Sequence, residues 1–514
     1  MKDQNGEPPE QNPQGGESLE SGRLCTGRCS TVDSGSHEHI RPDWHPEVVV
    51  VEFEIVFAPW EFFPAQVMDT HGEEHGQKRD SERVRSMIST VRQILAEHNA
   101  VKADWTFSFN SPDERAELDR ERFLSFFFPP VENSNLWLIA DELAALDFVV
   151  YAAPEPTVAP PSALLDEPLA VDGGVPHGIA VIVNPQKQIQ NQWYLFRCRA
   201  AGPLSHGVSG SGVIVADIDW GFRVSHQDLQ GQVSHSWNIT NNTPSVSQGA
   251  KVSHGTGVLG ILAAADNNRG MAGFAPGAKV WAIQADDGTG TLNNNYWVKA
   301  IDYARSRSSG NARKIIMIEV STKLSGNIEA SQVIRKAIIN ALDPKHNIVV
   351  CVTAGNGGKD ADFADDKIHA IPRTGSILIG ATQYKDNPND IRRGDSNYGR
   401  RVLVSAPGDS QRDVTCCNCG DTSYTNRFGG TSGAAPKVAG AIALMLQVNK
   451  TLTHNEVRQI LGSCGPVIVD DPAKPIGRFL DVEAAVAAAK NFKRTPPPKA
   501  PKSLDPVPDE SLSV

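Results

Sequence analysis

Four polar residues that border apolar or small-residue stretches have the side-chain types that acyl-transfer chemistry requires. Asp219 ends the apolar run GVIVADID, and Asn356 follows the run NIVVCVTAG. His254 opens HGTGVLG, and Ser432 lies in GGTSGAAPKVAG ahead of a long apolar run. Ligands of an open parallel sheet bind at the carboxyl ends of its strands. These four positions are therefore the first candidates for one functional site.

A serine hydroxyl is a weak nucleophile at neutral pH and needs a base within hydrogen-bond reach. That base needs an acid that fixes its tautomer and stabilises its charged form. Ser432, His254 and Asp219 are of the three required types. The helix expected after Ser432 directs free N–H groups and a positive dipole end toward an oxyanion, and the side-chain amide of Asn356 is a second donor. The set predicts nucleophilic catalysis with an oxyanion hole.

Each of these residues also has an ordinary structural interpretation. An aspartate at a strand end commonly caps a helix or forms a turn, and an asparagine between glycines commonly adopts a left-handed turn. A single histidine commonly packs in a core. Their occurrence together, in the order Asp, His, Asn and Ser at strand and helix ends of one sheet, favours the functional interpretation.

The elements that must position these residues form a pattern typical of a parallel sheet. From residue 212 onward, short apolar runs rich in β-branched residues alternate with expected helices. Such near-continuous apolar strands are typical of a sheet that helices cover on both faces. The runs are GVIVADID, KVWAIQA, KIIMIEV, NIVVCVTAG and SILIGAT. We therefore expect an α/β fold with a doubly wound, mainly parallel sheet.

Composition divides the 514 residues into five segments. Residues 1–44 are rich in Gly, Pro, Ser, Gln and Glu and are expected to be a disordered tail. Residues 45–155 combine strands at VVVVEFEIVF, ADWTFSF and FVVYAAPEP with helices at SERVRSMISTVRQILAEH and ADELAALDF, which predicts a small α+β domain. Residues 156–183 form a linker rich in proline and acidic residues, 184–492 hold the α/β domain, and 493–514 are a proline-rich tail.

Bulk composition is typical of a soluble globular protein, with 40% hydrophobic and 21% charged residues. The net charge of −11 repels polyanions, so nucleic acid is not expected as a partner. No window supplies the about 18 uncharged apolar residues of a membrane span. The N-terminal residues lack the apolar stretch of a secretory signal, which leaves an intracellular location or unconventional export.

Residues 184–490 resemble a subtilisin-family serine peptidase. VADIDWGFRVSHQDL resembles the aspartate motif of the family, HGTGVLG the histidine motif and GTSGAAPKVAG the serine motif. TAGNGG resembles the segment with the oxyanion asparagine, and NQWYL resembles the stretch that opens many mature members. The resemblance implies a protein or peptide substrate and endopeptidase activity through an acyl-enzyme, with no cofactor required for the chemistry.

Carried over position by position, the resemblance gives each candidate a role. Asp219 orients His254, which acts as general base and then as general acid. Ser432 attacks, and Asn356 holds the oxyanion together with the backbone N–H of Ser432. The segment IEVSTK, residues 318–323, stands where many members have a Ser, Leu, Gly, Gly run. The residues expected to bind an extended peptide are Glu319, Val320, Ser321 and Gly355.

The sequence departs from the family pattern beside the aspartate. Trp220 stands where the family usually has Ser or Thr, so a hydroxyl that commonly supports the carboxylate is missing. Asp217 lies two residues before Asp219 and points to the same face of a strand, which makes it a competitor for the orienting role. Asp219 is preferred because Gly221 follows it at the family spacing.

A structural calcium ion is a weaker expectation from the resemblance. Asp228 in SHQDL and Asn267 in AADNNRGMAG match positions that bind calcium in many members. Oxygen donors of this kind suit a hard cation. Solvated loop residues are the alternative interpretation.

The α+β domain of residues 45–155 resembles, in pattern more than in letters, the propeptide that chaperones and inhibits these enzymes. Its last strand resembles the segment that runs toward the active site. The chain's own N-terminal domain is therefore expected to be an intramolecular inhibitor that occupies the cleft and is released by cleavage in the linker. An unrelated accessory domain is the alternative.

The residue preferred before the cleaved bond is left open. The acidic stretch GGKDADFADD, residues 357–366, follows Asn356 and favours a basic side chain there. No Lys or Arg occurs between Arg122 and Lys187, however, so autocatalytic cleavage in the linker must follow a non-basic residue.

Two other functions remain as alternatives. One is a pseudoprotease that binds peptides without cutting them, for which Trp220 is the only sequence feature. The other is a zinc or redox module built on cysteines, of which the chain has eight. The candidate cysteines are Cys25, Cys29, Cys416, Cys417 and Cys419, and no nearby histidine or second cysteine pair completes a tetrahedral site. Thiols without a metal are therefore favoured.

Overall fold

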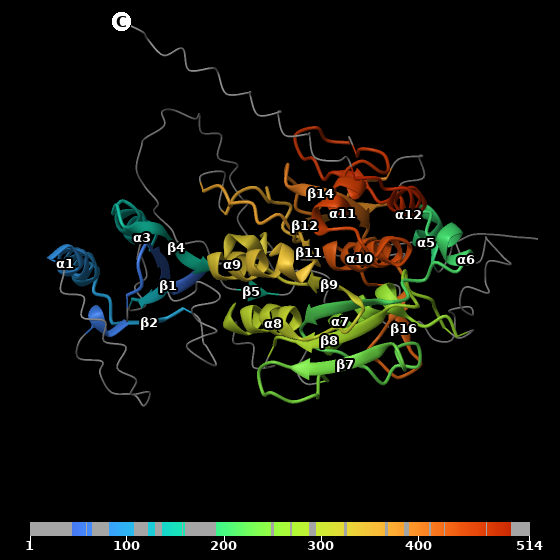
Figure 1. Ribbon diagram of the computed structural model, residues 1–514, viewed down its shortest axis with the longest axis horizontal. Helices are drawn as coiled ribbons and strands as arrows, with labels where there is room; N and C mark the ends of the chain where they lie inside the picture. Colours follow the sequence, from blue (N-terminus) through green and yellow to red (C-terminus); the bar gives the residue numbers. More distant parts are fainter. Residues whose placement is uncertain are drawn as a thin grey trace, which may run out of the picture.

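The fold of the chain is given by a computed structural model (Figure 1). The structure describes residues 44–57, 59–63, 82–106, 122–128, 136–156, 158–159, 192–247, 251–267, 270–286, 294–322, 326–364, 369–384, 390–410, 413–425, 427–468 and 470–494. Most of the two predicted tails, most of the linker, Cys25 and Cys29 lie outside these residues, and Trp44, the last residue of the predicted N-terminal tail, begins strand β1.

The larger body is built on one sheet with the strand order β17, β14, β12, β11, β9, β6, β8, β7. Neighbouring strands in this order are parallel, and β13 pairs antiparallel with β12. The bounds are β6 Val213–Asp219, β7 Val233–Asn238, β8 Lys279–Gln284, β9 Arg313–Ile318, β11 Ile348–Thr353, β12 Ile377–Gln383, β13 Ile391–Arg392, β14 Val402–Pro407 and β17 Arg478–Phe479. This arrangement confirms the predicted α/β fold with a doubly wound, mainly parallel sheet.

The order of the strands places a switch point beside β6. From β6 the chain builds β8 and β7 on one side, and β9, β11, β12 and β14 on the other. In such sheets the crevice for a ligand opens at the carboxyl ends of the strands where the order reverses. Asp219 is the last residue of β6, and Glu319 directly follows β9. The topology therefore puts the predicted site at the expected crevice.

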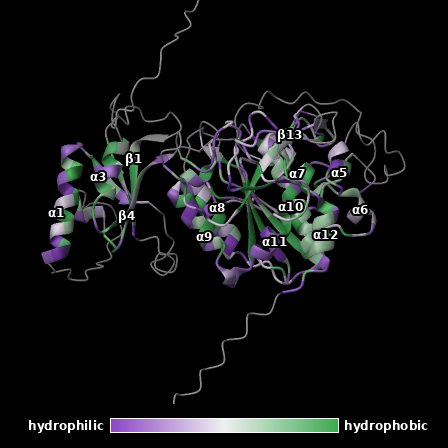
Figure 2. Cartoon of the chain, turned by 90° about the horizontal axis from the view of Figure 1, so that it is seen from above, coloured by the Kyte–Doolittle hydropathy of each residue, from purple (hydrophilic) through white to green (hydrophobic). Residues whose placement is uncertain are grey.

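Helices cover both sides of this sheet. Figure 2 shows α7 and α10 on one side and α8 and α9 on the other. The bounds of the helices of this body are α5 Trp193–Arg197, α6 Ala201–Ser205, α7 Val252–Ala263, α8 Asn294–Ser306, α9 Gln332–Ala341, α10 Thr431–Val448, α11 His454–Leu461, α12 Val482–Lys490, η4 Ile328–Ala330 and η5 Pro344–His346. Residues 431–446 of α10 are all buried, so this helix forms the centre of its layer.

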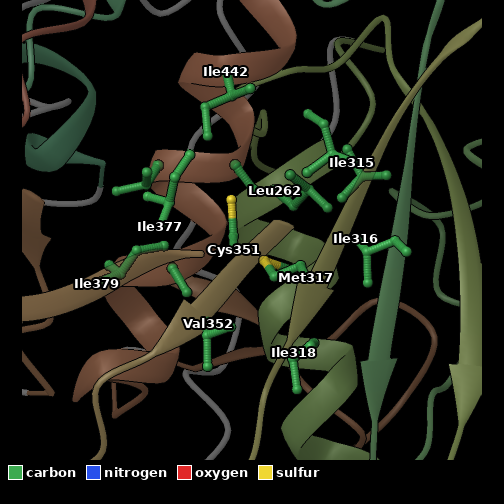
Figure 3. Close-up of a cluster of buried hydrophobic side chains, with 14 of the residues drawn as sticks. Leu262, Ile315, Ile316, Met317, Ile318, Cys351, Val352, Ile377, Ile379 and Ile442 are labelled. Carbon is green, nitrogen blue, oxygen red and sulfur yellow. The ribbon is translucent and has the colours of Figure 1, made fainter. Parts of the chain in front are cut away.

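The alternation of side chains along the strands divides the core into two faces. Cys351 pairs with Met317 of β9, and Val352 pairs with Ile318. In Figure 3, Cys351 points toward the helix that carries Ile442, whereas Val352 and Ile318 point to the opposite side. Odd-numbered residues of β9 and β11 therefore face α10.

The smaller N-terminal body has a four-stranded antiparallel sheet in the order β2, β3, β1, β4. Its elements are β1 Trp44–Phe53, η1 Pro59–Glu61, α1 Glu82–Glu97, β2 Lys102–Trp105, β3 Phe123–Phe127, α3 Leu136–Ala144 and β4 Val149–Pro156. It has a core of its own, with Phe53, Phe57, Phe62, Phe126 and Phe148 in contact. Each predicted strand and helix of this segment overlaps an observed one, but α3 ends at Ala144, before the end of the predicted helix ADELAALDF. Residues 107–109 of the predicted strand ADWTFSF lie outside the described residues, and β3 was not predicted.

The N-terminal body packs against α8 and α9 of the larger body. Ser331, which caps the N-terminus of α9, donates to Glu155 of β4 at 2.7 Å, and Gln332 donates to Glu52 of β1 at 2.8 Å. Figure 1 shows β4 running toward α9. Beyond β4, strand β5 (Val158–Ala159) pairs antiparallel with β10 (Ser321–Thr322).

Two short strands form a small sheet of their own. Strands β15 (Thr415–Cys416) and β16 (Tyr424–Thr425) form a separate antiparallel pair beside α7.

In the described ranges, every helix lacks the combination of length and apolarity that crossing a bilayer requires.

Candidate active site

Asp219 and His254 meet at the carboxyl end of β6. Nδ1 of His254, in the first turn of α7, lies 2.8 Å from Oδ1 and 2.9 Å from Oδ2 of Asp219. Both side chains are buried. Burial raises the pKa of Asp219, and the hydrogen bond and charge of His254 oppose that rise. The short bonds to both oxygens fix the ring so that its other nitrogen faces away from the carboxylate.

The other nitrogen of His254 faces Ser432. Nε2 lies 3.0 Å from Oγ of Ser432, the second residue of α10. The structure thus brings together Asp219, His254 and Ser432, which are separated by 35 and 178 residues in the chain. An imidazole held between a carboxylate and a hydroxyl at these distances can move the hydroxyl proton.

The carboxylate of Asp219 has a backbone donor at position 220, where the side-chain hydroxyl is missing. The N–H of Trp220 donates to Oδ1 of Asp219 at 2.5 Å. Asp217, the competitor weighed from the sequence, makes no hydrogen bond to His254 among the described contacts. The carboxylate that orients His254 is therefore that of Asp219.

Small residues before Ser432 allow a close approach of Asn356. Gly430 has a φ of 70°, and a Cβ there would lie 2.7 Å from Nδ2 of Asn356. Oδ1 of Asn356 accepts from the backbone N–H of Thr431 at 2.8 Å and from its hydroxyl at 2.9 Å. Because the amide oxygen is used by Thr431, the NH₂ group is the end that remains to donate.

A second donor is available at the start of α10. Ser432 belongs to the first turn of this helix, where backbone N–H groups have no carbonyl one turn earlier. The positive end of the helix dipole adds to the attraction for a negative charge. Asn356 and the Ser432 N–H together can therefore stabilise an oxyanion beside Oγ.

The predicted peptide-binding segment lies along this crevice, but its side chains turn inward. Glu319, Val320 and Ser321 are fully buried, and the N–H of Glu319 donates to the carbonyl of Ile218 at 3.2 Å. Ser321 pairs with Ala159 of β5 in the antiparallel register. Gly355 has a φ of 96°, and its carbonyl accepts from the N–H of Asn397 at 2.9 Å. Among the described residues, the edge of the sheet at Ser321 pairs with an extended segment of the same chain, and substrate binding by all four residues stays a prediction.

The acidic stretch at 357–366 is partly used to fix loops. Asp362 accepts hydrogen bonds from the backbone N–H groups of Arg400 and Arg401 at 2.8 and 3.0 Å. Asp360 accepts from the N–H of Asp362 at 3.0 Å. Residues 365–368 lie outside the described residues. These contacts show structural roles for two of the acids.

The residues predicted to bind calcium do not fit the ion as arranged. The carboxylate of Asp228 accepts from the hydroxyl of Tyr424 at 2.7 Å, from the N–H of Met271 at 2.9 Å and from Nδ2 of Asn267 at 3.4 Å. A calcium site presents oxygen acceptors to the metal, whereas these neighbours are N–H and O–H donors. The hydroxyl of Tyr424 fills the space beside Gly270, where a Cβ would lie 1.6 Å from it.

The cysteine cluster divides into a disulfide and a buried thiol. Cys417 and Cys419 are bonded to each other, which removes two of the three thiols that a zinc module would use. Cys416 lies within 4.8 Å of ligand atoms of His226 and Asp228. Burial raises the pKa of the Cys416 thiol, which disfavours the thiolate form. His226 is held by the carbonyl of Ser423 at 2.9 Å.

Two buried acids beneath the site were not predicted as a pair. Asp217 and Glu319 have fully buried side chains whose carboxyl oxygens make no hydrogen bond to the described residues. Burial raises the pKa of both well above the usual range, and the neighbouring carboxyl groups add to this. The sequence signal was the pair of aspartates two residues apart, which was weighed only as a competition for one role.

With this geometry in view, comparison with known proteins identifies the family. The model of the subtilase family matches residues 210–463. Subtilisin from Bacillus pumilus is 33% identical over 260 residues, which are 50% of this chain and 86% of that protein. Subtilisin DY from Bacillus licheniformis is 30% identical over 318 residues, which are 60% of this chain and 98% of that protein. The chain belongs to the subtilase family.

Other relatives are longer than the matched part. Subtilisin NAT from Bacillus subtilis subsp. natto is 33% identical over 260 residues, so this chain covers 62% of its length. The crystal structure of fervidolysin from Fervidobacterium pennivorans, a keratinolytic enzyme related to subtilisin, matches with a TM-score of 0.54 at 20% identity. That match covers 88% of this chain and 62% of fervidolysin, and it supports the fold.

Proposed function

We propose that the protein is a serine endopeptidase that hydrolyses protein or peptide substrates through Asp219, His254 and Ser432. The observation that carries the proposal is the imidazole of His254, whose two nitrogens lie 2.8 Å from the carboxylate and 3.0 Å from the hydroxyl. Membership of the subtilase family supports the same reaction. We infer a mechanism from the positions of these atoms.

In the first half of the reaction, Nε2 of His254 takes the proton of Ser432 as Oγ attacks the substrate carbonyl. The negative oxygen of the tetrahedral intermediate accepts hydrogen bonds from the Ser432 N–H and from Nδ2 of Asn356. Asp219 stabilises the imidazolium that forms. His254 then gives its proton to the leaving amine, and the acyl group remains on Ser432.

In the second half, water takes the place of the amine. His254 removes a proton from the water, which attacks the acyl carbonyl through the same oxyanion site. Collapse of the intermediate returns the proton from His254 to Oγ and releases the acid. Apart from the substrate and one water molecule, the groups of the chain balance these steps.

We further propose that the N-terminal domain is an intramolecular inhibitor. Support comes from the antiparallel pairing of β5 with β10, because an extended segment bound at that edge excludes a substrate from it. The polar contacts of Glu155 and Glu52 with α9 hold the domain in place. Cleavage of the linker would allow the domain to leave.

The binding-only alternative has lost its single supporting feature. It depended on the absence of a hydroxyl after Asp219, and the N–H of Trp220 supplies a hydrogen bond to that carboxylate. We therefore retain the enzyme as the only proposed function.

A fluorophosphonate probe tests the proposal, because it forms a covalent adduct only with an activated serine. Linker-cleaved wild type should be labelled, and Ser432→Ala should not. N-terminal sequencing of the same two proteins tests self-cleavage: wild type should begin within residues 155–190, and the variant should remain whole. A linker-cleaved protein that stays unlabelled would refute the proposed function.

A further inference from the structure

We propose that Glu319 is a positioning residue that remains a neutral carboxylic acid beneath Ser432, and that its ionisation sets the alkaline limit of catalysis. This inference rests on the proposed endopeptidase function. It concerns a residue for which sequence and family resemblance gave only a backbone role in peptide binding.

The sheet register places three acids on one face. Asp217 pairs with Met317 in the parallel register of β6 and β9, and the pairing continues to Ile218 and Ile318. Side chains alternate along a strand, so Asp217, Asp219 and Glu319 project to the same side. That side is the one covered by α7 and α10, because odd-numbered residues of β9 face α10 and Asp219 is bonded to His254 of α7. The helices that carry His254 and Ser432 thus cover all three acids.

The surroundings of Glu319 contain acids and no paired cation. Its side chain is fully buried, and neither carboxyl oxygen makes a hydrogen bond to a described residue. The titratable groups that face it are Asp217 and Asp219 of β6 and Cys351 of β11. The Ser432 hydroxyl of α10 also faces it. His254 of α7 lies beyond Asp219.

Burial and like charges both favour the protonated form of Glu319. An isolated carboxylate in such a place is unfavourable by several kcal/mol, and the usual outcome is that the group keeps its proton. Burial, Asp217 and Asp219 raise the pKa of Glu319 well above its ordinary value. Asp219 is the first of the three acids to ionise, because it is bonded to His254 and to the N–H of Trp220.

The protonation state of Glu319 decides where the Ser432 proton points. A neutral carboxyl offers an O–H donor, whereas a carboxylate is only an acceptor and attracts the nearest hydroxyl proton. An ionised Glu319 would therefore compete with His254 for the hydroxyl of Ser432. It would also place a negative charge near the oxyanion that forms during attack. Both effects slow acylation as pH rises.

The decisive variants are Glu319→Gln and Asp217→Asn. Glutamine keeps the shape of the neutral acid and cannot ionise, so the alkaline midpoint of the fluorophosphonate labelling rate should rise by about one pH unit or more. Asp217→Asn removes a neighbouring acid that raises the pKa of Glu319, so its alkaline midpoint should fall. Glu483→Gln, on the exposed side of α12, is the matched acid-to-amide control and should leave the midpoint in place.

Labelling rates at several pH values separate the proposed role of Glu319 from the proposed endopeptidase function. If wild type is labelled and the pH profiles of its labelling rate coincide with those of all variants, the role of Glu319 is overturned and the proposed function stands. Absence of labelling at every pH would refute the proposed function and the pH limit together.

An infrared spectrum tests the protonation of Glu319 without catalysis. At neutral pH the carbonyl band of a protonated carboxyl should be present in Ser432→Ala and weaker in Ser432→Ala with Glu319→Gln. An unchanged band would overturn the inference. If Glu319→Gln fails to fold, Asp217→Asn still tests the proposal. The alkaline midpoint of its labelling rate should fall, and a midpoint that does not fall contradicts the proposal.

Discussion

Nζ of Lys437 lies 2.6 Å from Oδ2 of Asp413, and both side chains are fully buried. The lysine lies inside α10, one turn beyond Ser432, and also donates to the carbonyls of Pro407 and Gly433 at 2.7 and 2.8 Å. The indole N–H of Trp193 donates to the other oxygen of Asp413 at 3.1 Å. This network ties α5, the loop before β15 and the helix of the nucleophile into one unit.

Removal of one partner from this ion pair should be strongly destabilising. Asp413→Asn leaves the Lys437 charge buried without its counter-ion, which predicts a loss of about 3–5 kcal/mol in the free energy of unfolding. The double variant Asp413→Leu with Lys437→Met should recover most of this loss. Urea denaturation in the Ser432→Ala background measures both. A loss below about 1 kcal/mol for Asp413→Asn, as for an exposed pair, would contradict the assigned burial.

Loss of the Asn356 amide should reduce turnover more than substrate binding. Asn356→Ala removes one oxyanion donor, and such a loss in subtilisin lowers kcat by about 100–1,000-fold. KM should change little, because the charge develops only in the transition state. Steady-state kinetics on a peptide substrate gives both constants. An effect confined to KM would show that Asn356 binds the ground state instead.

Docking of the N-terminal domain should weaken as pH rises. Burial raises the pKa of Glu155 from 4.5 to about 7, with Asn294, Ser331 and Arg335 opposing the rise. The docked form therefore holds a proton that the released form gives up. Docking is strongest below pH 4.5, weakens between 4.5 and about 7, and is constant above that range. The rise of the pKa from 4.5 to about 7 corresponds to a total change of roughly two to three orders of magnitude in affinity.

Size-exclusion chromatography can measure this docking. Ser432→Ala protein with a foreign protease site added to its linker is cut in trans, and retention of the two pieces is followed from about pH 5 to about pH 8. Glu155→Gln should flatten the pH dependence, and Glu97→Gln on the exposed side of α1 is the control. Release that increases toward acid pH would refute the assignment to Glu155.

Calcium should have no effect on the stability of the described fold around Asp228. Its carboxylate is already satisfied by Tyr424, Met271 and Asn267, so a chelator should leave Tm unchanged. Tyr424→Phe removes one hydrogen-bond donor from a buried carboxylate oxygen of Asp228, which predicts a loss of about 1–3 kcal/mol in the free energy of unfolding. Differential scanning calorimetry with calcium and with chelator measures both. A Tm that rises with calcium in wild type would restore the calcium site.

The fold was predictable where the sequence signal is local. Strands β9 and β11 contain the apolar runs IIMI and IVVCV and are buried at all six positions each, and this is the pattern of a strand covered on both faces. Strand β7 was missed because it lies at the sheet edge, and its mixed residues VSHSWN are mostly half-buried. Strand β14 was missed although its residues are largely buried, because short apolar runs do not separate strands from other buried segments.

Only those parts of the site that residue types and their order in the chain indicate were predictable from the sequence. Asp219, His254 and Ser432 were named from chemistry and resemblance. The neighbourhood of Asp217 and Glu319 depends on the register of two strands whose residues lie about 100 positions apart, and no local pattern carries that register. The bond between Cys417 and Cys419 and the donors around Asp228 likewise depend on side-chain placement in space.

The central claim, that His254 activates Ser432, is tested most directly by the position and rate of fluorophosphonate labelling. Mass spectrometry of linker-cleaved wild type should find the adduct on Ser432, and His254→Ala should abolish it while the protein stays folded. An adduct on another residue, or equal labelling of His254→Ala, would contradict the claim.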